Sequence, residues 1–197
     1  MRNRNNVLVG APDVKAAGGL TLGDVVTATA DVPDDATTEL ATSLNHEPAG
    51  YISEDGITKT VDRSTEKIKD WNGDTIIIVQ SDHSVSLQFT FMEAANGSVL
   101  KRVYGDENVT IDEGTGAVTI KETSDELPHF SLNAEIKGSA EKKIRLFAPD
   151  AQVVEVGDVT FIRSGVISYQ VTVEAFDDAD AVKLYQFIEG TAAPVTP

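Results

Sequence analysis

The side chains in this sequence that could catalyse a reaction or bind a metal are its histidines and its clustered acidic residues. A zinc or catalytic centre needs histidines at short, defined spacing. His46, His83 and His129 are scattered along the sequence and lack that spacing. The sequence therefore predicts no catalytic residue, no metal site and no cofactor.

Two acidic groups leave calcium as an alternative. One contains Asp106, Glu107, Asp112 and Glu113, and the other contains Asp177, Asp178 and Asp180. Neither has the spacing of an EF-hand loop. Because runs of charge usually face water, solvated acidic loops are the favoured interpretation.

Glycines gather near the start of the chain, at Gly10, Gly18, Gly19 and Gly23. They match neither a phosphate-binding loop nor a dinucleotide fingerprint. The sequence also lacks the G-x-S-x-G motif of a serine nucleophile. These absences argue against an enzyme.

Composition narrows the function further. The chain has 197 residues, 32 acidic and 16 basic, with a net charge of -16 and no cysteine. Such a charge repels phosphates, so tight nucleic-acid binding is not expected. The longest aliphatic run, residues 76–79, is far shorter than the ~20 residues of a membrane helix, and Pro12 interrupts the apolar start before a signal peptide could form.

Strand patterns dominate the chain. Residues 84–91 and 166–176 alternate between apolar and polar side chains, as half-buried strands do. Further strands are predicted at 108–111, 117–121, 130–136, 142–149 and 157–163, and helices at 34–46 and 96–105. Residues 1–30 are interpreted as an N-terminal arm, 31–188 as a single β domain and 189–197 as a C-terminal tail.

The pair Asn72-Gly73 predicts a projecting hairpin over about residues 62–80. Both residues tolerate the backbone of a two-residue type I′ turn. Strands 65–71 and 74–80 would then pair, with Trp71 opposite Asp74, Lys69 opposite Ile76, Ile68 opposite Ile77 and Lys67 opposite Ile78. Apolar side chains would lie on both faces, so another subunit or another part of the chain must cover the second face. The predicted subunit-interface residues are Ile68, Trp71, Asn72, Gly73, Ile76, Ile77 and Ile78; a core position or a ligand platform stays open for Trp71.

Six segments follow one another in a characteristic order: "VLVGAP", "GGLTLG", "PDDATTEL", "GYISEDGIT", "TEKIKDWNGD" and "FTFMEAANGSVLKRVYGDENVT". In combination they resemble the major tail tube protein of long, non-contractile-tailed bacteriophages, the siphovirus type, especially those of actinobacteria. The resemblance runs from about residue 7 to about residue 188.

This resemblance implies a β-sandwich or barrel-like subunit with one or two short flanking helices. Six subunits would form a ring, and rings would stack into a tube around the tape measure protein, bounded by tail terminator and tail-tip proteins. Phage DNA would leave through the lumen without specific binding. The protein would be assembled in the host bacterial cytoplasm and reside in the virion tail.

The polar faces of two strands are candidates for the lumen wall. If the apolar faces of 84–91 and 166–175 point into the subunit core, their polar faces would line the channel. The predicted lumen residues are Ser84, Ser86, Gln88, Thr90, Ser168, Gln170, Thr172 and Glu174, with one acid and no base. Two other functions stay open: a carbohydrate-binding or tail-decoration β-sandwich module, and a β-fold hydrolase.

Overall fold

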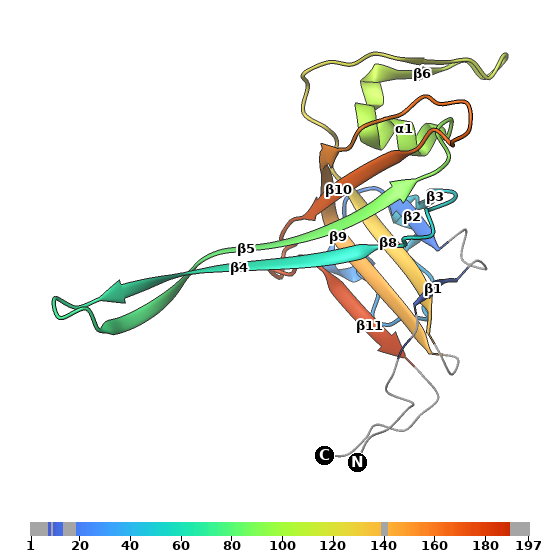
Figure 1. Ribbon diagram of the computed structural model, residues 1–197. Helices are drawn as coiled ribbons and strands as arrows, with labels where there is room; N and C mark the ends of the chain where they lie inside the picture. Colours follow the sequence, from blue (N-terminus) through green and yellow to red (C-terminus); the bar gives the residue numbers. More distant parts are fainter. Residues whose placement is uncertain (1–7, 9, 14–18, 139–141, 190–197) are drawn as a thin grey trace.

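The computed structural model describes residues 8, 10–13, 19–138 and 142–189, which form an antiparallel β protein with a long projecting hairpin (Figure 1). The main sheet contains β1 (Ala11–Pro12), β2 (Leu20–Gly23), β3 (Glu47–Pro48), β4 (Thr58–Lys69), β5 (Thr75–Phe91), β8 (Phe130–Lys137), β9 (Lys143–Val156), β10 (Tyr169–Ala175) and β11 (Tyr185–Glu189). A second sheet contains β6 (Val109–Ile111) and β7 (Val118–Ile120). The predicted mainly β fold is confirmed.

The main sheet curves so that its two ends approach each other. Its strand order is β3-β2-β8-β9-β10-β5-β4, with β1 paired to β8 and β11 paired to β9. After β3, the Ala49 N–H donates to the Leu20 carbonyl, and the Ser53 N–H donates to the Thr90 carbonyl on β5. Residues 47–53 therefore connect both ends of the sheet, which gives the body its barrel-like form and occupies edges that would otherwise be exposed.

The core fills the inside of this curved sheet. Alternate residues of β5, β8 and β10 point inward, among them Phe89, Leu132 and Val171, each no more than 3% exposed. The helix α1 (Gly97–Tyr104) covers one end and adds Val99, Leu100 and Val103 to the core. The Asn96 side chain accepts from the Ser98 N–H and so caps the first turn. The predicted helix at 96–105 is confirmed.

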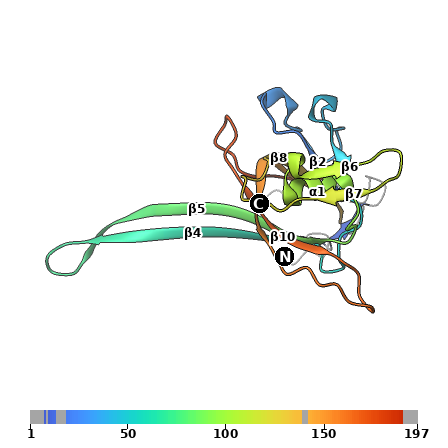
Figure 2. The same ribbon diagram turned by 90° about the horizontal axis from the view of Figure 1, so that it is seen from above.

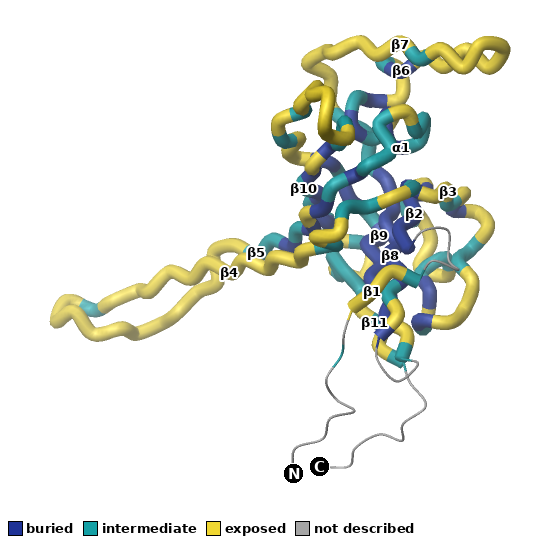
Figure 3. The backbone as a smooth tube through the Cα atoms, turned by 45° about the vertical axis from the view of Figure 1, so that its right-hand side comes forward, coloured by how far each residue is buried: buried dark blue, intermediate teal, exposed yellow. Residues whose placement is uncertain are grey.

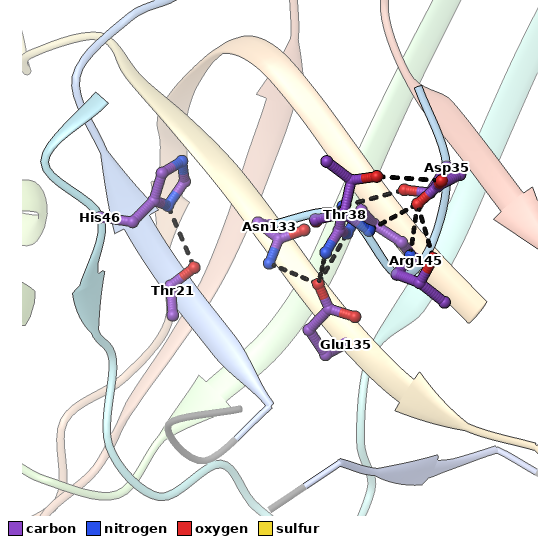
Figure 4. A network of polar contacts seen from close by, with 8 residues as sticks. Thr21, Asp35, Thr38, His46, Asn133, Glu135 and Arg145 are labelled. Carbon is purple, nitrogen blue, oxygen red and sulfur yellow. Dashed lines mark hydrogen bonds and ion pairs between the residues drawn. The ribbon is translucent and has the colours of Figure 1, made fainter. Parts of the chain in front are cut away.

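The opposite face of β2, β8 and β9 is covered by residues 24–46. Arg145 on β9 donates its Nε to the Glu135 carboxylate at 2.6 Å, and its NH1 to the carbonyls of Asp35 and Thr38 at 2.8 Å each. The ion pair is buried, with 5% of the arginine and 11% of the glutamate side chain exposed. Figure 4 shows how this network ties the covering segment to the sheet. Removing either charge would leave the other buried without compensation.

His46 joins the same segment to the sheet. Its Nδ1 lies 3.0 Å from the Thr21 hydroxyl and its Nε2 lies 3.2 Å from the Ser131 hydroxyl. Burial lowers the pKa of His46 to about 4, because burial disfavours the charged ring. A Cβ at Gly23 would lie 2.5 Å from the Leu44 carbonyl oxygen, so this close approach requires glycine.

The predicted helix at 34–46 is wrong. The Asp35 carboxylate accepts from the N–H groups of Thr37 and Thr38, which keeps the pKa of that carboxyl well below its usual range. The carbonyls of Asp35 and Thr38 bind Arg145 and are not available for helical hydrogen bonds. Only a short 3-10 turn, Thr42–Leu44, forms there; elsewhere in the described residues, 3-10 turns lie at Thr29–Asp31 and Asp106–Asn108.

The predicted N-terminal arm of residues 1–30 is too long. Leu20 and Leu22 of β2 are 1% exposed and pair with β8 inside the sheet, because their side chains belong to the core. Residues 1–7, 9 and 14–18 of the predicted arm, and 190–197 of the predicted tail, lie outside the described residues.

Strand boundaries near β9 also differ from the prediction. The predicted strand 157–163 is a loop, and β9 instead continues through Pro149 to Val156. Leu132 pairs with Ala148 and Phe130 pairs with Ala151, so a bulge lies beside the proline. Because proline has no N–H to donate to the ladder, a bulge is a position where a strand tolerates it.

Candidate subunit interface

A hairpin projects far from the body on one side (Figures 1 and 2). Strand β5 pairs with β10 only over residues 85–91, and beyond this point β4 and β5 pair only with each other. We call residues 62–84 the arm. Its eight β4 residues, 62–69, give a reach of about 27 Å at ~3.4 Å per residue. Figure 3 shows that the arm is almost entirely exposed, whereas the body holds the buried residues.

The turn of the arm is longer than predicted. The Asp70 N–H donates to the Asp74 carbonyl, and the Gly73 N–H donates to the Asp70 carbonyl, so three residues form the loop. Gly73 has a φ of 93°. This is a type I turn followed by a left-handed glycine, a conformation that does not require positive φ at Asn72. The Asp70 carboxylate also accepts from the Asp74 N–H at 2.8 Å.

The predicted register is correct over part of the arm. Lys67 pairs with Ile78 and Ile68 pairs with Ile77, as predicted. Lys69 pairs with Thr75, which leaves Ile76 in a bulge. The predicted pairing of Trp71 with Asp74 is wrong, because Trp71 lies in the turn rather than in β4.

The predicted interface residues are all exposed. Trp71 has an exposed fraction of 103%, and Ile68, Ile76, Ile77 and Ile78 range from 50% to 62%. A core position for Trp71 within this subunit is therefore wrong. Register places Ile77 and Ile78 on opposite faces, so each face of the arm carries uncovered apolar surface.

Charges are separated between the two faces of the arm. Strand β4 alternates without interruption, which places Arg63, Lys67 and Lys69 on one face. We call this the basic face; it continues the core-facing side of β5, because Val61 pairs with Val85. The other face, which we call the acidic face, carries Asp62, Glu66 and the β5 residue Asp82. The alternating charges of "DRSTEKIK" could have revealed this from the sequence.

The acidic face continues into the polar surface predicted to line a lumen. Gln170 pairs with Thr90, Thr172 with Gln88, and Glu174 with Ser86, so these side chains share one side of the β5–β10 sheet. Ser84 extends the row toward the arm, opposite Asp62. Ser168 lies outside β10 and does not belong to the row as a strand residue. The rows of β4, β5 and β10 on this side, all within the described residues, contain no lysine or arginine.

A pocket of about 420 Å³ opens in the body beside β1, β2 and β8. Its walls include apolar side chains of Pro12, Leu20, Ile52, Ile57 and Ile136. Among its described lining residues Glu54 and Asp55 are exposed acids, Glu135 is paired with Arg145, and none is basic. Sequence reasoning missed this pocket, because it is assembled from four distant segments.

A second exposed apolar region was also missed. Phe161 and Val166, in the loop between β9 and β10, are 76% and 61% exposed. The predictions of strands at 157–163 and 166–176 concealed them, since each strand would have buried one face. Tyr51, at the mouth of the pocket, is likewise 76% exposed.

In each of the two acidic groups of the sequence, one aspartate accepts hydrogen bonds from backbone N–H groups of its own loop. The Asp112 carboxylate accepts from the N–H groups of Gly114 and Thr115, and the Asp178 carboxylate accepts from the N–H groups of Asp180 and Val182. Asp178 also accepts from the Tyr185 hydroxyl, and burial raises the pKa of Tyr185 to about 12. Within the described part of the chain, no three or more His, Cys, Asp or Glu side chains gather around a point where a metal ion could bind.

The chain thus combines a barrel-like β body with an exposed arm whose two faces differ in charge, which is the form of a structural β protein. Residues 11–197 match the family model of the phage tail tube protein, and the chain belongs to that family. It therefore has a structural role in the virion tail, where it assembles into a tube and interacts with other tail proteins. No curated protein matches the chain. No helix in the described residues is long and apolar enough to cross a membrane.

Proposed function

We propose that this chain forms stacked hexameric rings in the tail of a siphovirus-type phage, and that the resulting tube delivers DNA into the host. The observation that carries the proposal is the arm. Its apolar side chains on both faces and its unpaired edges are surfaces that a monomer leaves unsatisfied. A head-to-tail contact that closes sideways and repeats along an axis satisfies them in a tube.

The polar row of β5 and β10 is proposed to face the lumen. It is continuous with the acidic face of the arm and carries no base, so a duplex would find no row of cations to bind. The basic face of the arm then points away from the DNA path, toward a neighbouring subunit. The tape measure protein would fill the lumen before ejection, and terminator and tail-tip proteins would close the ends.

Electron microscopy of the purified, concentrated chain tests the proposal. We expect tubes made of six-fold rings. Trp71→Ala should abolish them while leaving the melting temperature of the subunit unchanged, because Trp71 has no buried contact to lose within the subunit. Trp71→Phe should restore part of the assembly, since an aromatic ring is retained.

Other results would favour other functions. A monomer that binds glycans and never polymerises would favour the carbohydrate-binding or tail-decoration module, and turnover of an ester or glycan would favour a hydrolase. Rings with another symmetry would contradict the hexamer while leaving the tube.

A further inference from the structure

We propose that the Trp71 tip of one subunit docks into the 420 Å³ pocket of the next copy in the ring, with Lys67 and Lys69 facing Glu54 and Asp55. This inference rests on the proposed tube and assigns its lateral contact to named residues. The occupant of the pocket is a second copy of this chain.

Position supports this pairing. The arm leaves the body on one side, whereas β1 and the segment that leads into β4, which line the pocket, lie on the opposite side (Figures 1 and 2). A tip and a receptor on opposite sides cannot meet within one chain. They suit a head-to-tail contact, in which each subunit gives its arm to one neighbour and receives an arm from the other.

Shape and polarity match as well. A pocket of about 420 Å³ lies within the ~300–1,000 Å³ range of sites that hold small organic groups. Apolar side chains such as Leu20, Ile52 and Ile136 form its walls. An indole ring combines a large apolar surface with a polar N–H, and tryptophan is among the residue types most enriched at the centre of protein contacts. Trp71 is fully exposed at the end of the arm.

Charge determines which face of the arm meets the neighbouring subunit. Lys67 and Lys69 lie on the basic face, next to the turn that carries Trp71. Glu54 and Asp55 are exposed at the pocket, and no described lining residue is basic. Docking by the acidic face would place Glu66 against these carboxylates, which like-charge repulsion disfavours. The basic face therefore meets the neighbour, and the acidic face stays on the side of the polar row.

Cysteine crosslinking tests the contact, because the chain contains no cysteine of its own. One batch of subunits carries Asn72→Cys at the tip, and a second, differently tagged batch carries Asp55→Cys at the pocket. The two are mixed, allowed to assemble and oxidised. We expect a mixed disulfide between the two batches, and a ladder of covalent oligomers ending at the ring when one chain carries both cysteines.

A matched control replaces the pocket substitution with Thr115→Cys, in the exposed turn between β6 and β7. This pair should not crosslink. Tubes that form without a disulfide between the tip and the pocket, or in which the pocket cysteine bonds or is shielded elsewhere, would overturn the docking and leave the tube standing. Crosslinked rings that never stack would support the proposed docking but contradict the proposed tube. A chain that neither assembles nor crosslinks would overturn both.

Charge reversal supplies an independent readout. Lys67→Glu with Lys69→Glu should raise the protein concentration needed for assembly at least tenfold. Adding Glu54→Lys and Asp55→Lys should restore assembly, because the ion pairs are re-formed in reverse. The subunit's melting temperature should stay unchanged throughout, since all four side chains are exposed. A failure of the second pair to rescue the first would mean that these residues do not meet.

Discussion

Strand β5 runs through two regions of the molecule that differ in burial and in strand pairing. In residues 85–91 it lies in the body, where alternate side chains are buried in the core and β4 and β10 flank it on both sides. In residues 75–84 the same strand lies in the arm, paired only with β4 and exposed on both faces. In the body β5 therefore pairs on both edges and buries one face, whereas in the arm it pairs on one edge and buries neither face. A two-stranded ribbon alone is marginally stable in water, so the arm depends on the body for its form. In the proposed tube, a neighbouring subunit covers its apolar side chains.

The largest expected effect is in the body. Arg145→Met leaves Glu135 buried without its partner and frees the carbonyls of Asp35 and Thr38. We expect a loss of about 3–5 kcal/mol in the free energy of unfolding. Urea denaturation of the monomer measures it. The double variant Arg145→Met, Glu135→Leu should recover much of the loss. Equal loss in both variants would mean that the arginine stabilises the fold through its packing and its bonds to the two carbonyls rather than through the ion pair.

A matched pair of apolar truncations compares body and arm directly. Leu132→Ala removes a side chain that is 0% exposed and should cost about 2–5 kcal/mol of monomer stability. Ile77→Ala removes one that is 53% exposed and should change monomer stability by less than ~0.5 kcal/mol while weakening assembly. Thermal unfolding and sedimentation separate the two outcomes. A destabilised monomer in the Ile77 variant would show that the arm is covered within its own subunit.

Lowering the pH should reduce the stability of the body before it affects the arm. Folded His46 stays neutral down to a pKa of about 4, whereas in the unfolded chain it takes up a proton below about pH 6.5. The unfolded state therefore binds more protons in this window, and stability falls as the pH drops from 6.5 to 4, by at most about 3 kcal/mol. His46→Gln should flatten this part of the profile. An unchanged slope in the variant would assign the pH dependence to other groups.

The smallest effect on stability is expected on the polar row. Gln88→Lys places a long exposed side chain beside Thr172 and should change monomer stability by less than ~0.5 kcal/mol. In the assembled phage we expect slower DNA ejection at low salt and normal ejection at high salt, because the added cations attract phosphates and salt screens them. Normal rates at every ionic strength would mean that another surface lines the lumen.

Local patterns in the sequence predicted much of the fold. Alternation identified β5 and β10, and the spacing of Val99, Leu100 and Val103 identified α1. The Asn72-Gly73 pair located the arm, and its register was correct at Ile68. These features depend on neighbours along the chain, which is the information that a sequence displays directly.

The errors came from long-range contacts. The segment 34–46 has helical spacing of leucines, but Arg145, more than 100 residues away, binds its carbonyls. Pro149 ended the predicted strand, although a bulge lets β9 continue. The pocket could not be predicted, since β1, β2, β8 and residues 51–57 meet there only after folding.

The two bulges of β5, at Ser81 and Ile76, constrain how this sequence can diverge. With one residue fewer or more between them, the outer part of β5 would shift by one position, and Ile77 and Ile78 would exchange faces. A substitution in the arm changes one side chain, whereas a single-residue insertion or deletion moves every side chain in the outer part of β5 to the opposite face. Related tail tube chains should therefore vary in residue type at arm positions outside the proposed docking contact, while length changes there occur at the bulges, at the turn or in compensating pairs.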